Sequence, residues 1–439
     1  MNLSPPIPRI GRPGSGTESP PTRPIGPANR TPVRSRSGAV RRERHEADYV
    51  IVVVVIALTA IGILMVYSSS ALKGYLSADN NTFATVGPQI QWAVLGIVAM
   101  LVMMRVDYRY LRLASVPMFI IALIALTLLF VPSLNVVIGG SARWLKLGPL
   151  PAVHPAEFAK LALIVYLAHW SAKRGARIGG FWSGTVPFLI IIAPIIGLVF
   201  LEPDLGTTGV ITLTAFTMFF IAGANLVQLG ILGATGLVGL AVFMQGYQMD
   251  RIRVWLDPWS DQLGNGYHTV QGLMALGVGG LFGTGLGESR VFVPNAFNDF
   301  IFAEIGQEFG FIGAAVVIAL FVLLAYSGIR IALAAPDTFG ALIAAGITAW
   351  LCLQAIINIG VVVTILPITG ITLPFISAGG SSLIISFAAI GILLSISRET
   401  VQKGTWNTDA DPDRGRRDGR THLPGTRRGK VAARTSGRS

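Results

Sequence analysis

The sequence of 439 residues contains few charged residues and a single cysteine. Charged residues make up 13% of the chain and hydrophobic residues 52%, whereas soluble domains carry about 25% charged residues. This shortage of charge excludes an ordinary soluble enzyme and indicates a protein that crosses a membrane several times. The lone cysteine, Cys352, lies in an apolar run, so an intramolecular disulfide is excluded.

The sequence also lacks the short motifs of several enzyme classes. It contains no phosphate-binding loop of the GxxxxGKS or GxxxxGKT type, and no cysteine–histidine cluster with the spacing of a zinc site. The glycine-rich stretch Gly277–Gly287 does not stand between a predicted strand and a predicted helix, so it does not indicate a dinucleotide site. Close packing of the backbone, or a flexible loop, is its ordinary interpretation.

The net charge of +12 comes almost entirely from the two ends of the chain. Residues 1–48 hold nine arginines against four acidic residues, and residues 398–439 hold eleven arginines and lysines against five acidic residues. Basic ends around a nearly neutral apolar body indicate cytoplasmic tails that attract anionic membrane lipids, not a nucleic-acid-binding protein. We predict disordered tails over residues 1–48 and 399–439, and a membrane domain over residues 49–398.

Hydropathy predicts ten transmembrane helices in this domain. Their approximate bounds are 49–69, 88–104, 113–132, 155–171, 184–201, 206–223, 227–246, 301–326, 338–362 and 381–397. An even number of spans places both termini on one side, and the basic residues of the loops mark that side as cytoplasmic. The predicted fold is therefore an all-α polytopic membrane protein, with a large outer loop over residues 247–300 between helices 7 and 8.

Carboxylates gather where this outer loop meets the eighth helix. Asp299 precedes the helix, and Glu304 and Glu308 lie four residues apart, which places them on one helix face. A carboxylate at the membrane boundary is costly unless it is paired, hydrated or used, so the three are predicted to line a functional cavity. One of them would then have a shifted pKa and act as a base. The alternative for Asp299 is a helix cap.

The other candidate residues also have structural alternatives. Asp204, in EPDLGTTG, either contributes to a site or caps the next helix. Arg143 and Lys146, in GGSARWLKLG, either bind a phosphate or pyrophosphate group or anchor the chain at the membrane interface. Glu157 and Lys160 are three residues apart on one helix face, so they either serve a site or only pair with each other.

Several longer motifs carry a resemblance to a known family. They are GGSARWLKLG, HPAEFAKLALIVYLA, EPDLGT, LDPWSDQLGNGYH, GGLFGTGLGESR, NDFIFAEIGQEFGFIG and NIGVVVTILPITGITLPFISAGGSS. Together with the layout of ten spans, they make residues 49–398 resemble the SEDS family (shape, elongation, division and sporulation), which includes FtsW, RodA and SpoVE. The resemblance implies a peptidoglycan glycosyltransferase that polymerises lipid II on the outer face of the bacterial cytoplasmic membrane.

The resemblance also implies roles for individual residues. Asp299, in the DFIF motif, matches the family's proposed catalytic aspartate and would act as general base on the acceptor sugar hydroxyl. Asp204 matches the aspartate of the PDLG motif. Arg143 and Lys160 match a family arginine and lysine, and with Lys146 they would stabilise the departing undecaprenyl pyrophosphate.

Further substrate-binding residues are predicted at Glu304, Glu308 and Ser381. A divalent cation, Mg²⁺ or Mn²⁺, could assist near Asp204 or Glu304, although the sequence defines no metal site. Ser381, in SAGGSS, is not accompanied by an SxxK or KTG motif, so it does not indicate a transpeptidase nucleophile. The resemblance therefore implies that a class B penicillin-binding protein supplies cross-linking, within a division or elongation complex.

The chain departs from the family pattern at several positions. Glu202 stands where glutamine is common before PDLG, and Gln307–Glu308 replaces the usual pair of glutamates. Ala378 replaces a tyrosine in the SYGGSS motif, and Thr369 stands where many division-type members have lysine. The GITLPFIS motif and the long basic tails favour the FtsW branch over the RodA branch.

Two other classes of protein compete with the polymerase hypothesis. A transporter that moves lipid II across the membrane would also explain ten spans with charges among them, but it requires a charged path through the middle of the bilayer. The residues capable of chemistry cluster instead on the outer side, with Glu157 and Lys160 as the main exception. A non-catalytic scaffold that recruits a transpeptidase would leave Asp299 unexplained.

Overall fold

The computed structural model describes residues 48–76, 85–138, 141–146, 148, 151–243, 246–294 and 296–399. Its elements are α1 (Tyr49–Leu76), α2 (Val86–Arg105), α3 (Tyr110–Leu128), β1 (Asn135–Ile138), β2 (Ser141–Leu145), α4 (Pro155–Arg174), η1 (Gly175–Gly179), η2 (Phe181–Thr185), α5 (Val186–Leu201), α6 (Leu205–Ile221), α7 (Leu226–Phe243), α8 (Gly246–Leu256), η3 (Pro258–Asp261), α9 (Tyr267–Gly279), α10 (Ile301–Ala334), α11 (Thr338–Val362) and α12 (Gly380–Ser397). Apart from Asp48 and Glu399, both predicted tails lie outside the described residues.

Each of the ten predicted spans coincides with one helix, namely α1 to α7 and α10 to α12. Within the described residues, seven helical stretches are long and apolar enough to cross a membrane, and they contain α1, α2, α3, α5, α10, α11 and α12. Helices α6 and α7 are apolar but shorter, and α4 contains both Glu157 and Lys160. The all-α membrane fold is confirmed, whereas a crossing by all ten helices stays a prediction.

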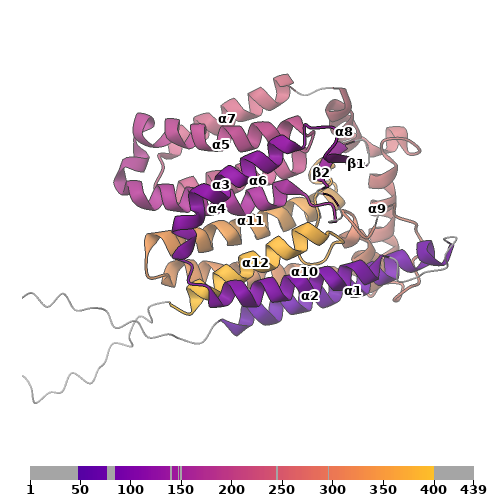
Figure 1. Cartoon of the computed structure of the whole chain (residues 1–439). Helices are drawn as coiled ribbons and strands as arrows, with labels where there is room; N and C mark the ends of the chain where they lie inside the picture. Colours follow the sequence, from indigo (N-terminus) through magenta and orange to yellow (C-terminus); the bar gives the residue numbers. More distant parts are fainter. Residues whose placement is uncertain are drawn as a thin grey trace, which may run out of the picture. The chain divides into compact units, whose positions relative to one another are not determined.

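Helices α11 and α12 form the centre of the membrane domain (Figure 1). In the most apolar stretch of 18 residues in each helix, 67% of the residues of α11 and 72% of those of α12 are buried, against 22% in α3 and 28% in α2. The four helices α2, α3, α11 and α12 are mostly apolar on every side, because one part of their surface packs on neighbours and the rest faces lipid. The buried helices α11 and α4 also contain polar side chains, and these become important at the candidate site.

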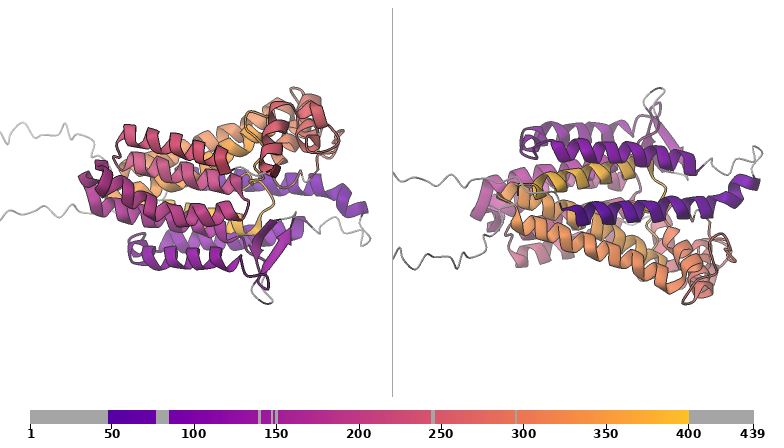
Figure 2. Two further views of the ribbon diagram at one scale, coloured as in Figure 1. Left: turned by 90° about the horizontal axis from the view of Figure 1, so that it is seen from above. Right: turned by 90° about the horizontal axis from the view of Figure 1, so that it is seen from below.

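One end of the helices contains the small elements that the hydropathy pattern did not predict. Strands β1 and β2 pair antiparallel, and α8 and α9 lie at the same end, which we call the hairpin end (Figures 1 and 2). The loop predicted over residues 247–300 is therefore partly helical. Helix α9 forms there because it can bury Val270 and Ala275 and pack against α10.

The first and last described helices begin and end at the opposite end. The Asp48 amide donates a hydrogen bond to Ser397 Oγ at 3.3 Å, and the Asp48 carboxylate pairs with Arg330. Arg109, between α2 and α3, pairs with Glu399 at 2.6 Å. These contacts agree with the predicted even number of spans, since α1 starts where α12 ends. The assignment of this end to the cytoplasm stays a prediction.

The glycine-rich segment that follows α9 packs on a break in α10. Helix α10 is interrupted at Gly310, whose φ of 67° and ψ of −164° are not helical. The break frees backbone groups, and the segment satisfies them: Thr284 N donates to Gln307 O at 2.9 Å, and Phe311 N donates to Gly280 O at 2.9 Å. A broken helix at membrane depth requires such partners. Close backbone packing, one of the two interpretations of this stretch, is confirmed.

Candidate active site

Asp299 lies in the turn that leads into α10, at the hairpin end. The residue that caps this helix is Phe300, and no side chain accepts a hydrogen bond in the capping position. The helix-cap alternative for Asp299 is therefore wrong. Burial raises the pKa of the Asp299 carboxyl above its ordinary value, while a hydrogen bond from its own backbone amide and the charges of His268 and Arg251 oppose the rise.

The backbone around Asp299 is fixed by α11 and by the loop of residues 366–379. Asn358 Nδ2 donates hydrogen bonds to the carbonyl oxygens of Asp299 and Ile371, both at 2.8 Å. A Cβ atom at Gly370 would lie 3.9 Å from Asp299 Oδ2. The loop thus presents bare backbone to the carboxylate. Arg251 Nη1 donates to the carbonyl of Ile368 at 3.0 Å, so α8 holds the same loop.

Asp204 occupies a different position, because its carboxylate is the cap of α6. It accepts hydrogen bonds from Thr207 N at 3.0 Å and from Thr207 Oγ1 at 2.9 Å. Arg143 Nε lies 3.9 Å from Asp204 Oδ2, and His154 Nε2 lies 3.6 Å from the same oxygen. The capping alternative for Asp204 is confirmed, and the carboxylate also organises two basic side chains.

The surroundings of both aspartates contact one short segment of the 366–379 loop. A Cβ atom at Gly206, two residues after Asp204, would lie 2.8 Å from the carbonyl oxygen of Thr369 and 2.4 Å from Ile371 Cγ2. The same segment meets Asp299 through Gly370. Residues that are distant in the sequence are therefore joined into one wall at the hairpin end.

Arg143 is positioned on the turn between α5 and α6. Its Nη2 donates to the carbonyl of Pro203 at 2.5 Å, and its Nε lies 3.4 Å from the carbonyl of Glu202. Glu202 is buried, and burial together with the nearby Asp204 charge raises its pKa to about 8, against the opposing charge of Arg143. The turn that contains Glu202 is therefore covered by protein.

His154 completes this group of basic and acidic side chains. Its ring makes an edge contact with Trp144, with centroids 5.6 Å apart, and its backbone amide donates to Ser381 Oγ at 3.3 Å. Burial lowers the pKa of His154, although the charges of Asp204 and Glu157 oppose the decrease. A neutral imidazole beside Asp204 is the expected form. The contact also brings the predicted substrate-binding residue Ser381 to this group.

Lys160 and Glu157 pair deep between α4 and α11. Lys160 Nζ donates to Glu157 Oε1 at 2.9 Å and to Gln354 Oε1 at 2.7 Å, and it lies 5.0 Å from the centroid of the Trp350 ring. Gln354 Nε2 in turn donates to the carbonyl of Thr372 at 2.9 Å. The predicted pair exists, and it supports the same loop that contacts Asp299.

Glu304 and Glu308 share one face of α10, as predicted, but they belong to another network. Both are buried, with 3% and 1% of their surface exposed. Ser289 Oγ donates to Glu304 and, at 3.0 Å, to Glu308 Oε1. Ser68 Oγ and Gly287 N also donate to Glu308. The expected convergence of three carboxylates is therefore corrected: the two glutamates connect α10 to residues 287–289, and Glu308 also connects it to α1.

Lys146 lies directly after β2 with an exposed side chain. Its backbone amide donates to the carbonyl of Leu134 at 2.9 Å, which extends the hairpin. It is thus close in sequence to Arg143, but its side chain faces outward. Within the described residues, no group of three or more His, Cys, Asp or Glu side chains is placed to hold a metal ion.

Five residues of the site were not predicted from the sequence: His154, Arg251, His268, Gln354 and Asn358. For the last two a signal exists. Gln354 and Asn358 are four residues apart in an otherwise apolar helix, and polar side chains at that spacing inside a membrane span indicate a buried polar face. The two histidines and Arg251 come from loops and short helices, where no periodicity marks them.

The fold and the site together define a class of protein. It is a polytopic membrane protein with buried polar side chains at one membrane surface and, beside them, a carboxylate that caps no helix. Residues 48–402 match the family described as "Cell cycle protein", FtsW/RodA/SpoVE. The chain belongs to this family. The predicted choice of the FtsW branch over the RodA branch stays a prediction.

Three similar proteins illustrate the relationship. Stage V sporulation protein E of Bacillus subtilis (strain 168) is 42% identical over 357 residues, which cover 80% of this chain and 97% of the relative. A probable peptidoglycan glycosyltransferase FtsW of Trichlorobacter lovleyi is 38% identical over 360 residues, 80% and 93% of the two chains. A chain of a solved peptidoglycan synthase complex aligns with a TM-score of 0.68 and 29% identity, covering 81% of this chain and 99% of its own length.

Proposed function

We propose that this chain is a peptidoglycan glycosyltransferase that polymerises lipid II on the outer face of the cytoplasmic membrane. The contrast between Asp299 and Asp204 is the observation that carries the proposal. Asp204 is occupied as the cap of α6, whereas Asp299 caps no helix and has a raised pKa. A carboxylate left uncommitted at the membrane boundary is a functional group by default, and the raised pKa suits a general base.

The reaction requires one displacement. The acceptor sugar hydroxyl attacks the anomeric carbon of the donor, the new glycosidic bond forms, and the bond to undecaprenyl pyrophosphate breaks. Asp299 accepts the hydroxyl proton, and the pyrophosphate departs with the bonding electron pair. One base without a second nucleophile matches an inverting transfer, by analogy with inverting glycosidases.

Two arginines are placed to counter the charge of the leaving group. Arg143 is oriented by the carbonyls of the α5–α6 turn, and Arg251 lies near enough to influence the charge of Asp299. A guanidinium held in place costs little reorganisation when charge develops on a phosphate. Lys160, by contrast, is committed to Glu157 and Gln354, so we assign it to positioning the loop.

This chain has a surface that suits the proposed partner, a class B penicillin-binding protein with a single membrane-spanning helix. A cavity of about 1000 Å³ lies along α9, α10 and α11. Six of its fourteen lining residues are small, namely Gly280, Gly306, Gly310, Ala314, Ala315 and Ala319, and the other eight are large and apolar. Small side chains allow two helix backbones to approach closely inside a membrane. We propose that the partner's helix docks there, next to α10, which begins two residues after Asp299.

The transporter alternative is less well supported by the buried charges. The cavity beside Lys160 has a volume of only about 10 Å³, which is hardly room for one water molecule. Lys160 and Glu157 therefore behave as a closed pair and do not line a path for a headgroup. The scaffold alternative gives no role to Asp299, which is partly buried and caps no helix.

Polymerisation by the purified full chain tests the proposal. The protein is incubated with lipid II, with and without the penicillin-binding protein, and the products are separated by length on a gel. We expect glycan polymer, and more of it with the partner. Absence of polymer under both conditions would contradict the enzyme proposal, and movement of lipid II across vesicles without polymer would favour the transporter.

The docking surface has its own test. Ala319→Trp fills the proposed groove, whereas Leu333→Trp enlarges a residue that is 83% exposed elsewhere on α10. Only the first should weaken co-purification with the partner and remove the partner's stimulation. Equal behaviour of the two variants would place the partner on another face.

A further inference from the structure

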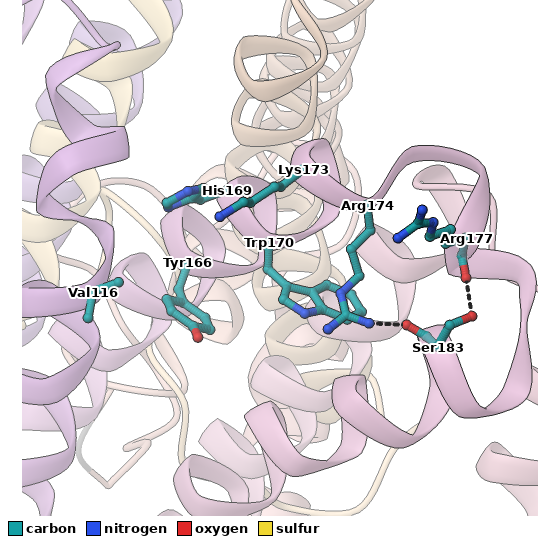
Figure 3. Close-up of a pocket in the computed structure, with 8 residues that line it drawn as sticks. All are labelled: Val116, Tyr166, His169, Trp170, Lys173, Arg174, Arg177 and Ser183. Carbon is teal, nitrogen blue, oxygen red and sulfur yellow. Dashed lines mark hydrogen bonds between the residues drawn. The ribbon is translucent and has the colours of Figure 1, made fainter.

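A third cavity, of about 600 Å³, lies at the opposite end of the helices from Asp299. The described residues that line it come from α3, α4, η1 and η2, and are Val116, Tyr166, His169, Trp170, Lys173, Arg174, Arg177 and Ser183 (Figure 3). Helix α4 has 20 residues and starts at the candidate active site, so it is about 30 Å long. That length equals the hydrocarbon thickness of a bilayer, and the cavity therefore lies at the other membrane surface.

The lining of this cavity has one sign of charge. Lys173, Arg174 and Arg177 contribute three cations, and the eight residues include no carboxylate. An excess of cations on the cytoplasmic side follows from the positive-inside rule, but that rule does not require the cations to surround a hollow. The volume falls within the range of about 300–1,000 Å³ that is typical of small-molecule sites.

One of these cations, the Arg174 guanidinium, is held in place. The Arg174 guanidinium lies 4.9 Å from the centroid of the Trp170 ring and donates a hydrogen bond to the carbonyl of Ser183 (Figure 3). Ser183 Oγ donates to the carbonyl of Arg177 at 2.7 Å. Through these contacts, η1 and η2 fold back over the end of α4. A stacked and hydrogen-bonded guanidinium is a suitable receptor for phosphate oxygens.

Exposed aromatic residues place the cavity at the level of lipid headgroups. Phe181 is 49% exposed and Trp182 is 79% exposed, and both lie in η2 beside the lining residue Ser183. Large aromatic side chains with this exposure are typical of the membrane–water interface. A molecule in the cavity would therefore sit at the depth of a phospholipid phosphate.

An apolar strip leads from the cavity along α3 into the membrane. Val116 lines the cavity, and Ile120 and Ile124 follow it at intervals of four, which places all three on one helix face. They are 46%, 49% and 54% exposed. A free phosphate would not contact this strip, whereas an acyl chain attached to a bound headgroup would cover it and bury its apolar surface.

We propose that this cavity binds the phosphate group of an anionic phospholipid, with one acyl chain lying along Val116, Ile120 and Ile124. The inference goes beyond the polymerase activity and does not depend on it. It adds a lipid site on the face of the membrane opposite to Asp299. Soluble phosphate esters share the headgroup chemistry, so the test separates them from the lipid.

The test measures binding of dioleoylphosphatidylglycerol to the delipidated full chain in detergent, by native mass spectrometry. Lys173→Gln and Arg177→Gln each remove one cation from the lining, and Arg105→Gln removes one exposed cation from the end of α2, outside the cavity. Each basic residue near an anionic headgroup contributes about 1 kcal/mol, or about fivefold in affinity. We expect about fivefold weaker binding for each lining variant and no change for the control.

Charge-conserving variants and a soluble competitor complete the design. Lys173→Arg and Arg177→Lys should retain most of the lipid affinity, which shows that a lost fold does not explain the glutamine variants. Glycerol phosphate should compete far more weakly than the lipid. Wild-type affinity in both glutamine variants, an equal loss in the control, or equal affinity for glycerol phosphate and the lipid would each overturn the proposal.

Discussion

The substitution Asp299→Asn gives the sharpest test of the proposed base. Asparagine keeps the shape of the side chain but cannot accept a proton. A positioned carboxylate base contributes about 10²- to 10⁴-fold to a rate, so the initial rate of lipid II polymerisation should fall by about that factor. The measurement is the rate of polymer formation by the detergent-purified chain together with its partner, at saturating lipid II.

The stability of the same variant should not fall. Because burial raises the pKa of Asp299 in the folded protein, the folded state binds the proton more tightly than the unfolded chain. Stability is therefore lost as the pH rises from the unfolded pKa through the folded pKa, and the charged carboxylate costs stability at neutral pH. Asparagine removes that cost, so the melting temperature at neutral pH should stay equal or rise.

Asp204→Ala is the matched comparison, because that carboxylate caps a helix. Loss of an aspartate cap costs about 0.5–2 kcal/mol, and the buried Thr207 hydroxyl would lose its acceptor. This variant should therefore melt at a lower temperature, unlike Asp299→Asn. A near-normal polymerisation rate for Asp299→Asn would refute the base assignment. A lowered melting temperature for Asp299→Asn would show that the side chain serves the fold.

Three further predictions use the geometry of the site and the predicted topology. Arg143→Lys replaces a fork that bonds two carbonyls by a point donor, so kcat/KM should fall at least about tenfold; an unchanged value would favour simple anchoring. Lys160→Met leaves the buried Glu157 unpaired and should destabilise the fold by about 3–5 kcal/mol, while the double variant with Glu157→Leu should recover most of that loss in a thermal melt. Deletion of residues 1–40 and 405–439 should leave the rate of polymerisation by the purified chain nearly unchanged, because both segments are predicted to lie across the membrane from Asp299; a large loss would contradict that orientation.

The helices of the membrane domain could be predicted because their signal is local. A run of apolar residues long enough to cross a bilayer marks a helix wherever it packs, and all ten predicted spans coincide with helices. The glycine-rich segment was also interpretable, since a stretch of residues without side chains allows close approach of another backbone. The break at Gly310 was not predictable, because it depends on the segment that packs against it.

The site was only partly predictable because its contacts join distant parts of the chain. The sequence indicated Asp299, Asp204, Arg143 and Lys160, yet it could not decide which aspartate caps a helix. Both precede an apolar helix, and the helix-start signal is the same for both. The difference is a single residue in where each helix begins: α6 starts directly after Asp204, whereas Phe300 stands between Asp299 and the start of α10.

The loop between α11 and α12 explains why these residues act together. Gly370 has a φ of 73°, which residues with a side chain rarely adopt, and a Cβ atom there would lie 3.9 Å from Asp299 Oδ2. The same loop accepts a hydrogen bond from Gln354, which also holds Lys160, and it contacts Gly206 at the start of α6. A loop that contacts both Asp299 and the start of α6 would keep the proposed base at a fixed distance from the proposed phosphate-binding residue Arg143, and fixed geometry is what the proposed displacement between two bound lipids requires.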